Sequence, residues 1–348
     1  MKVLITGATG FVGGAVARKL LADGDTVTAL TRGGHERTLP LEKAGATIVV
    51  GSVGDPNGIA EAARGCDVIV HAAAVVGDHA SRRALRWVNV AGTENVINAA
   101  KRAGVERMVH LSCADVTLWN GDRIHWNENR AGSLPAGEHA RTKLLAEELA
   151  ISASDDDLEI VVIRPAWVWG PGDTTTLPRL CREARLHGLQ LIGSGKNLFS
   201  SLYIDNLAVA VQRALTAENT AGRAYYVTDH DTLSAREFFG QMCNAVGVAS
   251  PKSGLALSIA YPKARLFRSG PNALSPAEVL RRGTNTLFDI QKAMTDLSYD
   301  PPVTVPEGMA ALATWVSGAG GPAAVETLGR PPTGDGSVDE QVALAGGD

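Results

Sequence analysis

The chain has 348 residues but few cysteines, no excess of positive charge and no long apolar run. Its four cysteines lack Cys-x-x-Cys spacing, which argues against a zinc site or a disulfide framework and favours reduced thiols in the cytoplasm. No apolar run reaches the roughly 20 residues that span a bilayer, and the apolar N-terminus runs into a glycine turn instead of a signal-peptide cleavage region. A net charge of -4 gives no reason to expect nucleic acid or a membrane as partner.

Strand and helix signals alternate through the first half of the chain. Val/Ile-rich runs separated by helical patterns indicate a parallel sheet covered by helices on both faces, which is a Rossmann-type, doubly wound α/β fold. The predicted strands are 2–6, 26–31, 46–50, 67–71, 107–111 and 159–163, and the predicted helices are 11–22, 82–103 and 138–152.

This rhythm loosens beyond Gly170, so we expect the chain to divide into three parts. Residues 1–169 are predicted to form an NADP-binding core, and residues 170–316 mostly a substrate-binding lobe with some elements returning to the core. Residues 317–348 are rich in Gly, Ala, Pro and Thr and are predicted to be a disordered tail. The sequence leaves open whether the protein is a monomer or a homodimer.

A glycine-rich turn joins the first predicted strand to the first helix. In this setting the pattern predicts a dinucleotide site more strongly than a structural turn. Gly7 permits the tight turn, Gly10 lets the backbone approach the pyrophosphate, and Gly13 allows close packing of the helix, whose N-terminus offers N–H groups to the phosphates. The expected contacts at this turn are Gly7, Thr9, Gly10, Phe11, Val12 and Gly13.

The end of the second strand distinguishes NAD from NADP. An acidic residue at this place would accept hydrogen bonds from the ribose 2′-hydroxyl, whereas this chain has Thr31-Arg32, followed by Arg37. A guanidinium suits a 2′-phosphate through its charge and its planar donors. The sequence therefore predicts NADPH, with Arg32 as the principal contact and Arg37 as a second.

Several ordered motifs resemble those of the extended short-chain dehydrogenases/reductases, in particular the 3β-hydroxysteroid dehydrogenase and dihydroflavonol reductase branch. They cover the chain to about Val316 and include the segments 6–13, 70–74, 89–96, 164–173, 203–207 and 222–227. The resemblance implies an oxidoreductase with cofactor contacts at Ser52, Val53, Ala72, Ala73, Ala74, Pro165, Ala166, Trp167 and Val168. The Asp that the family usually has beside the adenine is missing here.

The catalytic positions depart from this family. The family has Tyr-x-x-x-Lys on a helix, where the spacing places both side chains on one face, and a Ser at the end of the preceding strand. The matching residues here are His139, Lys143 and Cys113, and no tyrosine precedes Tyr203. The resemblance implies that Lys143 holds the nicotinamide ribose, but the family's proton relay is absent.

Three interpretations of this loss remain open. The protein could be a catalytically silent NADP sensor that binds a protein partner. It could also be a reductase in which His139 supplies the proton, since imidazole suits neutral pH. Finally, a phenol of the substrate itself could supply the proton. In lacking the Ser and the Tyr, the chain resembles the atypical angucyclinone ketoreductases of the simocyclinone type. The resemblance favours an NADPH-dependent ketoreductase acting on a polycyclic aromatic polyketide ketone.

Aromatic residues around the expected pocket suit a large flat ligand, because burial and stacking of aromatic side chains supply much of the binding energy for fused rings. The predicted substrate contacts are Val75, Cys113, Trp119, Trp126, Trp167, Phe199 and Tyr203. The basic residues of the outer lobe, Arg281 and Arg282 among them, are predicted to form a solvated face. No metal site is expected.

Overall fold

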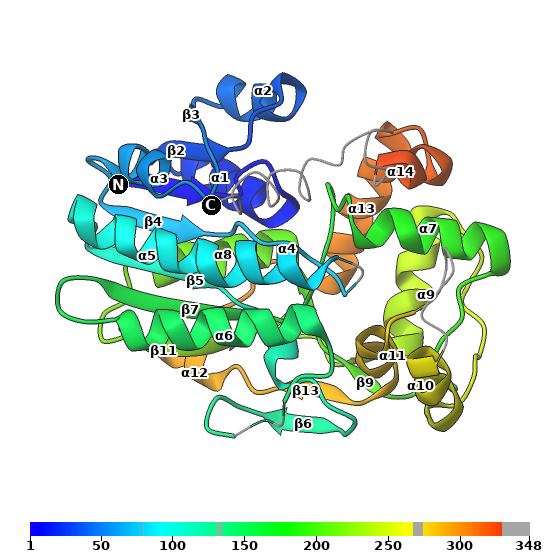
Figure 1. Ribbon diagram of the computed structural model, residues 1–348. Coiled ribbons are helices and arrows are strands. Elements are labelled where there is room, and N and C mark those ends of the chain that lie inside the picture. The colour runs from blue at the N-terminus through cyan, green and yellow to red at the C-terminus, as the bar shows by residue number, and fades with distance from the viewer. Residues whose placement is uncertain (79, 131, 133, 267–273, 329–348) are drawn as a thin grey trace.

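A parallel sheet of seven strands lies at the centre of the computed structural model, which describes residues 1–78, 80–130, 132, 134–266 and 274–328 (Figure 1). From one edge to the other the strands are β11 (Arg223–Val227), β7 (Glu159–Pro165), β5 (Arg107–Leu111), β4 (Val68–His71), β1 (Lys2–Thr6), β2 (Thr26–Thr31) and β3 (Thr47–Val50). The direction of winding reverses between β1 and β4, which is where such sheets bind ligands. The predicted Rossmann-type fold is confirmed.

Helices cover both faces of this sheet because successive buried strand residues point to opposite sides. One face packs against α1 (Phe11–Ala22), α2 (His35–Lys43), α8 (Ile204–Ala214) and α12 (Gln291–Asp296). The other face packs against α3 (Pro56–Ala63), α5 (Gly92–Ala103) and α6 (Glu138–Ala153). Strand β11 and helices α8 and α12 therefore return to the core from the second half of the chain.

The segment predicted as one helix over 82–103 consists of three pieces. Helix α4 (Arg82–Arg86) leads into a π-helical turn (Trp87–Ala91), and α5 follows directly. A π turn widens the helix locally, and here it directs Asn89 inward, where only 1% of the residue is exposed. Side-chain periodicity alone does not distinguish this turn from a continuous α-helix.

The remaining elements form an outer lobe and the strands beside it (Figure 1). Its helices are α7 (Thr176–His187), α9 (Ala235–Val246), α10 (Leu257–Leu266), α11 (Pro276–Gly283), α13 (Val305–Gly318) and α14 (Pro322–Leu328). A small sheet of two strands pairs β10 (Ser201–Tyr203) with β8 (Trp167–Trp169). A second small sheet contains, in this order, β12 (Leu233–Ser234), β9 (Leu198–Phe199), β13 (Thr286–Phe288) and β6 (Arg123–Trp126). A short 3-10 helix, η2 (Ala114–Thr117), follows β5.

Part of the segment predicted to be a disordered tail, residues 317–348, is helical, because it includes the end of α13 and all of α14. Helix α14 packs against α7, with Val325 fully buried. Glu326 lies 2.8 Å from Nε of Arg185 and 3.4 Å from Nε of Arg182. Residues 322–328 therefore pack against α7, a contact that amino-acid composition does not predict. Residues 329–348 lie outside the described part of the chain. Within the described ranges, no helix has the length and apolarity needed to cross a membrane.

Candidate active site

The turn between β1 and α1 has the geometry of a phosphate cradle. Gly7 has a φ of 72°, and a Cβ there would lie 2.8 Å from the backbone of Ala73. A Cβ on Gly13 would lie 2.3 Å from the carbonyl oxygen of Gly7, so only glycine allows the helix this close to the turn. Gly10, the residue before α1, provides no side-chain cap, which leaves the first N–H groups of the helix for a ligand. These residues fit a bound dinucleotide.

The residues expected near the adenosine half gather at the ends of β2 and β3. Arg32 follows β2, Arg37 lies on α2, and both are exposed. Ser52 accepts a hydrogen bond from the N–H of Gly54 at 3.1 Å. The Val53 side chain is buried against the α5 side of the sheet, so only the backbone of Val53 is offered to a ligand.

The loop after β4 is fixed by hydrogen bonds. Thr6 Oγ1 accepts from the N–H of Ala73 at 3.2 Å. The Asn89 amide bonds to both backbone groups of Val75, at 2.8 and 3.1 Å, and donates to Thr142 Oγ1 on α6 at 3.0 Å. Ala72, Ala73, Ala74 and Val75 are all partly exposed along this loop. Asn89 thus joins the loop to the helix that carries His139 and Lys143, a role that the sequence reading did not assign to it.

The segment after β7 runs into the outer lobe. Pro165 ends β7, and the N–H of Ala166 donates to Val227 of β11 at 3.0 Å. The half-buried ring of Trp167 packs against Phe199 and Phe239, with centroids 5.2 and 5.3 Å apart. Val168 packs against the buried residues of both the core and the lobe.

Helix α6 brings His139 and Lys143 to the end of β5. The two residues lie four apart on α6, and Lys143 is buried, with Nζ donating to the carbonyl of Leu111 at 2.5 Å. Electrostatic interactions link Lys143 to both His139 and Cys113. The helix begins at Gly137, which offers no side-chain cap, and Asp78 accepts from the N–H of His139 at 3.0 Å instead.

Burial determines the protonation of these groups. Burial, assisted by the charge of Lys143, lowers the pKa of His139 to about 4. Burial also raises the pKa of the Cys113 thiol to about 12 and lowers the pKa of Lys143. At neutral pH His139 is therefore an uncharged imidazole, and Cys113 is neither a thiolate nor an effective acid.

Two residues that the sequence reading did not assign to the site also belong to this region. Asp115 on η2 forms an ion pair with Arg281 on α11, whose Nε lies 2.7 Å from Oδ2. Asp78 accepts from Ser275 Oγ, at the start of α11, at 3.2 Å. The solvated face predicted for Arg281 and Arg282 is therefore wrong, since Arg282 is 3% exposed and bonds to Glu183 at 3.2 Å.

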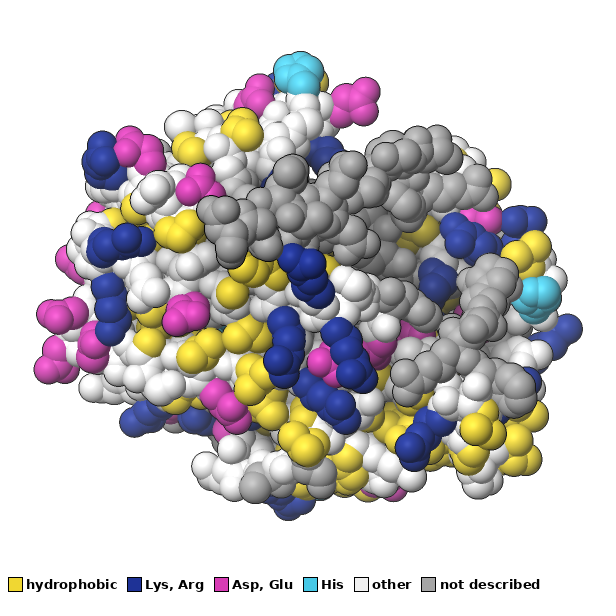
Figure 2. All heavy atoms as spheres, in the orientation of Figure 1, with side chains coloured by type: hydrophobic (Ala, Val, Ile, Leu, Met, Phe, Trp, Pro, Cys, Tyr) yellow, Lys and Arg dark blue, Asp and Glu magenta, His cyan; other side chains and the backbone are white. Residues whose placement is uncertain are grey.

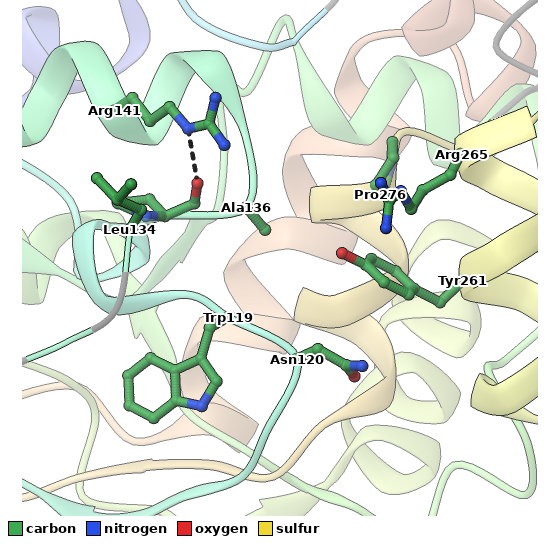
Figure 3. Close-up of a pocket in the computed structure, with 9 residues that line it drawn as sticks. Trp119, Asn120, Leu134, Ala136, Arg141, Tyr261, Arg265 and Pro276 are labelled. Carbon is green, nitrogen blue, oxygen red and sulfur yellow. Dashed lines mark hydrogen bonds between the residues drawn. The ribbon is translucent and has the colours of Figure 1, made fainter.

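A cavity of about 310 Å³ opens beside the start of α6, between the core and α10 and α11 (Figure 3). Trp119 and Tyr261 supply its aromatic lining, and Arg141 and Arg265 supply positive charge. Trp126 contacts Trp119 edge-on, with ring centroids 4.7 Å apart, and does not line the cavity itself. On the nearby surface, α4 carries three exposed arginines, and Figure 2 shows basic side chains gathered in this area.

Two of the predicted substrate contacts are core residues instead. Phe199 is 2% exposed and Tyr203 is 3% exposed, and both pack inside the outer lobe. Phe199 contacts Phe238 and Phe239, while Tyr203 packs edge-on against Trp169. An aromatic residue in a lobe that covers a site can line the pocket or fill the core, and the sequence did not distinguish these cases.

Known proteins resemble this chain along most of its length. Residues 4–257 match the model of the 3-beta hydroxysteroid dehydrogenase/isomerase family. The chain is 33% identical over 329 residues to 2-alkyl-3-oxoalkanoate reductase of Stenotrophomonas maltophilia, a match that covers 89% of this chain and 97% of that protein. It is 29% identical over 322 residues to a Stigmatella aurantiaca ketoreductase named for a 3-oxo-dihydroquinoline-1-oxide, covering 90% and 96% of the two chains.

Solved structures show the same fold at lower sequence identity. UDP-glucuronic acid 4-epimerase from Bacillus cereus, in complex with UDP-glucuronic acid and NAD, has a TM-score of 0.73 and 20% identity, covering 91% of this chain and 99% of that one. The dTDP-glucose 4,6-dehydratase DesIV from Streptomyces venezuelae, with NAD bound, also has a TM-score of 0.73, with 24% identity and coverage of 91% and 97%.

The family match and the reductase relatives define an oxidoreductase that acts on CH–OH or C=O groups. The chain belongs to the 3-beta hydroxysteroid dehydrogenase/isomerase family.

Proposed function

We propose that the protein is an NADPH-dependent ketoreductase for polycyclic aromatic ketones of the antibiotic polyketide type, in which the substrate's own phenol supplies the proton. The carbonyl of such a ketone is flanked by a phenolic hydroxyl, whose internal hydrogen bond polarises the C=O group. The protein then has two tasks, to orient the substrate and to stabilise charge on its oxygen. Angucyclinone-type ketones have this arrangement.

The cofactor site is proposed from the residues that surround it. The turn from Gly7 to Gly13 would hold the pyrophosphate, Arg32 the 2′-phosphate, with Arg37 as a second contact, and Lys143 the nicotinamide ribose. The segment Pro165–Val168 would pass beside the nicotinamide. When bound, NADPH supplies a hydride to the carbonyl carbon.

The protonation states of His139 and Cys113 carry the argument for a substrate-derived proton. A general acid works best when its pKa lies near the working pH. The pKa of His139 is lowered to about 4 and that of Cys113 is raised to about 12, so neither matches neutral pH. The chain also has no tyrosine before Tyr203. This combination favours the phenol over His139 as the proton source.

The cavity supports a flat aromatic substrate. Trp119 and Tyr261 line it. Trp119 lies in the segment that leaves the end of β5, two residues after η2. Among the relatives, the Stigmatella aurantiaca enzyme is named for a ketone on a fused quinoline ring system, which supports a fused-ring ketone here as well.

The decisive experiment uses NADPH with deuterium at the transferable C4 position and matched pairs of polycyclic ketones. One member of each pair carries a hydroxyl beside the carbonyl, and the other carries its methyl ether. We expect deuterium on the carbinol carbon of the hydroxy ketones, and at least about 100-fold slower turnover of the ethers, since a positioned proton donor contributes ~10²–10⁴-fold. Equal rates for both members would refute phenol catalysis. Tight NADPH binding without label transfer to any ketone would favour the cofactor sensor.

A further inference from the structure

Arg281 enters the candidate active site from helix α11 of the outer lobe. Its Nε donates to Oδ2 of Asp115 at 2.7 Å, and its Nη2 forms an ion pair with the same oxygen. Asp115 lies two residues after Cys113, so this contact fixes the guanidinium at the end of β5. The two residues are 166 positions apart in the chain, and their pair joins the outer lobe to the end of β5.

The guanidinium also faces the segment proposed to seat the nicotinamide. Its Cζ lies 5.9 Å from the centroid of the Trp167 ring. Its electrostatic interactions reach Cys113 and His139, the positions at which the family has Ser and Tyr. Within the described ranges, the contacts of the guanidinium with Asp115 use Nε and Nη2, which leaves the donors of Nη1 for a ligand.

Arg281 keeps its positive charge at this place. Burial alone would lower the pKa of Arg281, but the charge and the hydrogen bond of Asp115 outweigh burial and raise it. The Arg281 side chain is 28% exposed, so a ligand can reach it from solvent. A permanently charged guanidinium cannot deliver a proton at neutral pH, yet it can stabilise negative charge.

We infer that Arg281 stabilises the negative charge on the substrate's carbonyl oxygen and replaces the missing tyrosine hydroxyl in this respect. The inference deepens the proposed function and rests on it. As the hydride adds to the carbonyl carbon, the π electrons of C=O move to oxygen. Nη1 of Arg281 donates a hydrogen bond to this alkoxide, which then takes the proton of the neighbouring phenol and leaves a phenolate. Arg281 itself is neither protonated nor deprotonated.

A bound naphthol tests this role without turnover. In a complex with the protein and NADP⁺, 1-naphthol presents an oxygen that can carry negative charge, and its neutral and ionised forms have different absorption spectra. We expect the wild-type complex to bind naphtholate at least tenfold more tightly than naphthol, which lowers the pKa of the bound naphthol by at least one unit. Arg281→Gln combined with Asp115→Asn removes both charges but keeps a polar pair, and it should abolish this shift.

Two further variants separate charge from structure. Arg281→Lys keeps a cation and should retain at least half of the shift in naphthol pKa. This holds even if the neutral pair, the double variant Arg281→Gln with Asp115→Asn, proves less stable than the wild type. Lys263→Gln removes one exposed charge from the same lobe and should leave the shift unchanged. With a hydroxy ketone, the neutral pair should lower kcat about 100-fold and change KM less than threefold, since losing one oxyanion donor costs ~10²–10³ in kcat.

The results distinguish this inference from the proposed function. A naphthol pKa that the wild-type complex does not lower, or that the neutral pair lowers equally, overturns the role of Arg281. If ketones are reduced without any naphthol shift, the ketoreductase stands and the role of Arg281 falls. If the shift is present but no ketone accepts deuterium, the charge of Arg281 acts on an anionic ligand and the reductase proposal falls.

Discussion

His139 lies one helical turn before Lys143 on α6, and the sequence motif aligns it with the tyrosine of the family. Burial and the charge of Lys143 hold the pKa of His139 at about 4, so the ring carries no dissociable imidazolium proton at pH 7. We therefore expect His139→Ala to keep kcat within about threefold, well below the ~10²–10⁴-fold that a general acid contributes. Steady-state rates from pH 5 to 9 should show no decline that depends on His139.

Tyr261 is the matched control for this variant. It lies on α10 of the outer lobe and lines the cavity proposed for the substrate. Tyr261→Phe removes only its hydroxyl and should leave kcat unchanged if the phenol of the substrate supplies the proton. A 100-fold loss of kcat in either variant, with NADPH binding and thermal stability preserved, would contradict substrate-derived protonation and identify the acid.

Arg32 is expected to determine the choice of cofactor. It follows β2 and is exposed, as a residue that receives a 2′-phosphate must be. A charge-assisted hydrogen bond contributes ~1.5–3 kcal/mol. Arg32→Ser should therefore raise the Kd for NADPH about 10- to 100-fold and leave that for NADH nearly unchanged. Titration of both cofactors by fluorescence measures this, with Arg37→Ser for comparison. Equal weakening of NADH binding would show that Arg32 acts on folding or on the adenosine generally.

At the scale of elements, the π turn positions the loop after β4, which is proposed to contact the cofactor. The Asn89 amide oxygen accepts a hydrogen bond from the N–H of Val75, and its nitrogen donates to the Val75 carbonyl and to Thr142 Oγ1. Asn89→Ala leaves both backbone groups of Val75 without these partners, which should cost about 1–3 kcal/mol of unfolding free energy. We expect the variant to bind the cofactor roughly tenfold more weakly and to show faster amide hydrogen exchange in the loop after β4.

Asn98 provides the control for the π turn. It lies on the exposed face of α5, and Asn98→Ala should change neither stability nor cofactor affinity. If Asn89→Ala and Asn98→Ala behave alike, the π turn does not position the loop.

The sequence predicted the elements whose signal is local. The strands and α1 could be placed because buried parallel strands consist of Val/Ile runs and the glycine turn has a fixed spacing. The contacts of Arg281 with Asp115 and of Asp78 with Ser275 join residues more than 160 positions apart, so periodicity carried no sign of them. The π turn was also not predicted, since one widened turn barely changes the pattern of apolar residues along a helix.

At the scale of the whole molecule, two buried histidines make stability depend on pH. His71 and His110 lie on neighbouring strands, with ring centroids 5.4 Å apart. His71 bonds to Thr6 and Thr93, whereas both ring nitrogens of His110 lack a partner in the described structure. Burial, together with the charge of Lys143, lowers the pKa of His71 to about 3 and that of His110 well below its ordinary value.

The sign of the effect follows from proton counts. An unfolded histidine takes up a proton near pH 6.5, while these two stay neutral in the folded state, so the unfolded chain binds more protons as the pH falls. The stability that depends on His71 is fully present above about pH 6.5 and is lost as the pH falls towards about 3, by roughly 1.4 kcal/mol per pH unit. The contribution of His110 has the same sign, and its loss also begins as the pH falls below about 6.5.

His110→Phe should therefore flatten the acid limb of the stability curve. Phenylalanine fills similar space, carries no unpaired nitrogen and takes up no proton in the unfolded state. As the pH falls below about 6.5, the variant should lose less unfolding free energy than the wild type, as measured by urea titration. His187→Gln, at an exposed position near the end of α7, should follow the wild-type curve. A variant that loses stability as steeply as the wild type would show that His110 is already protonated in the fold or that its site opens to water before the rest of the sheet.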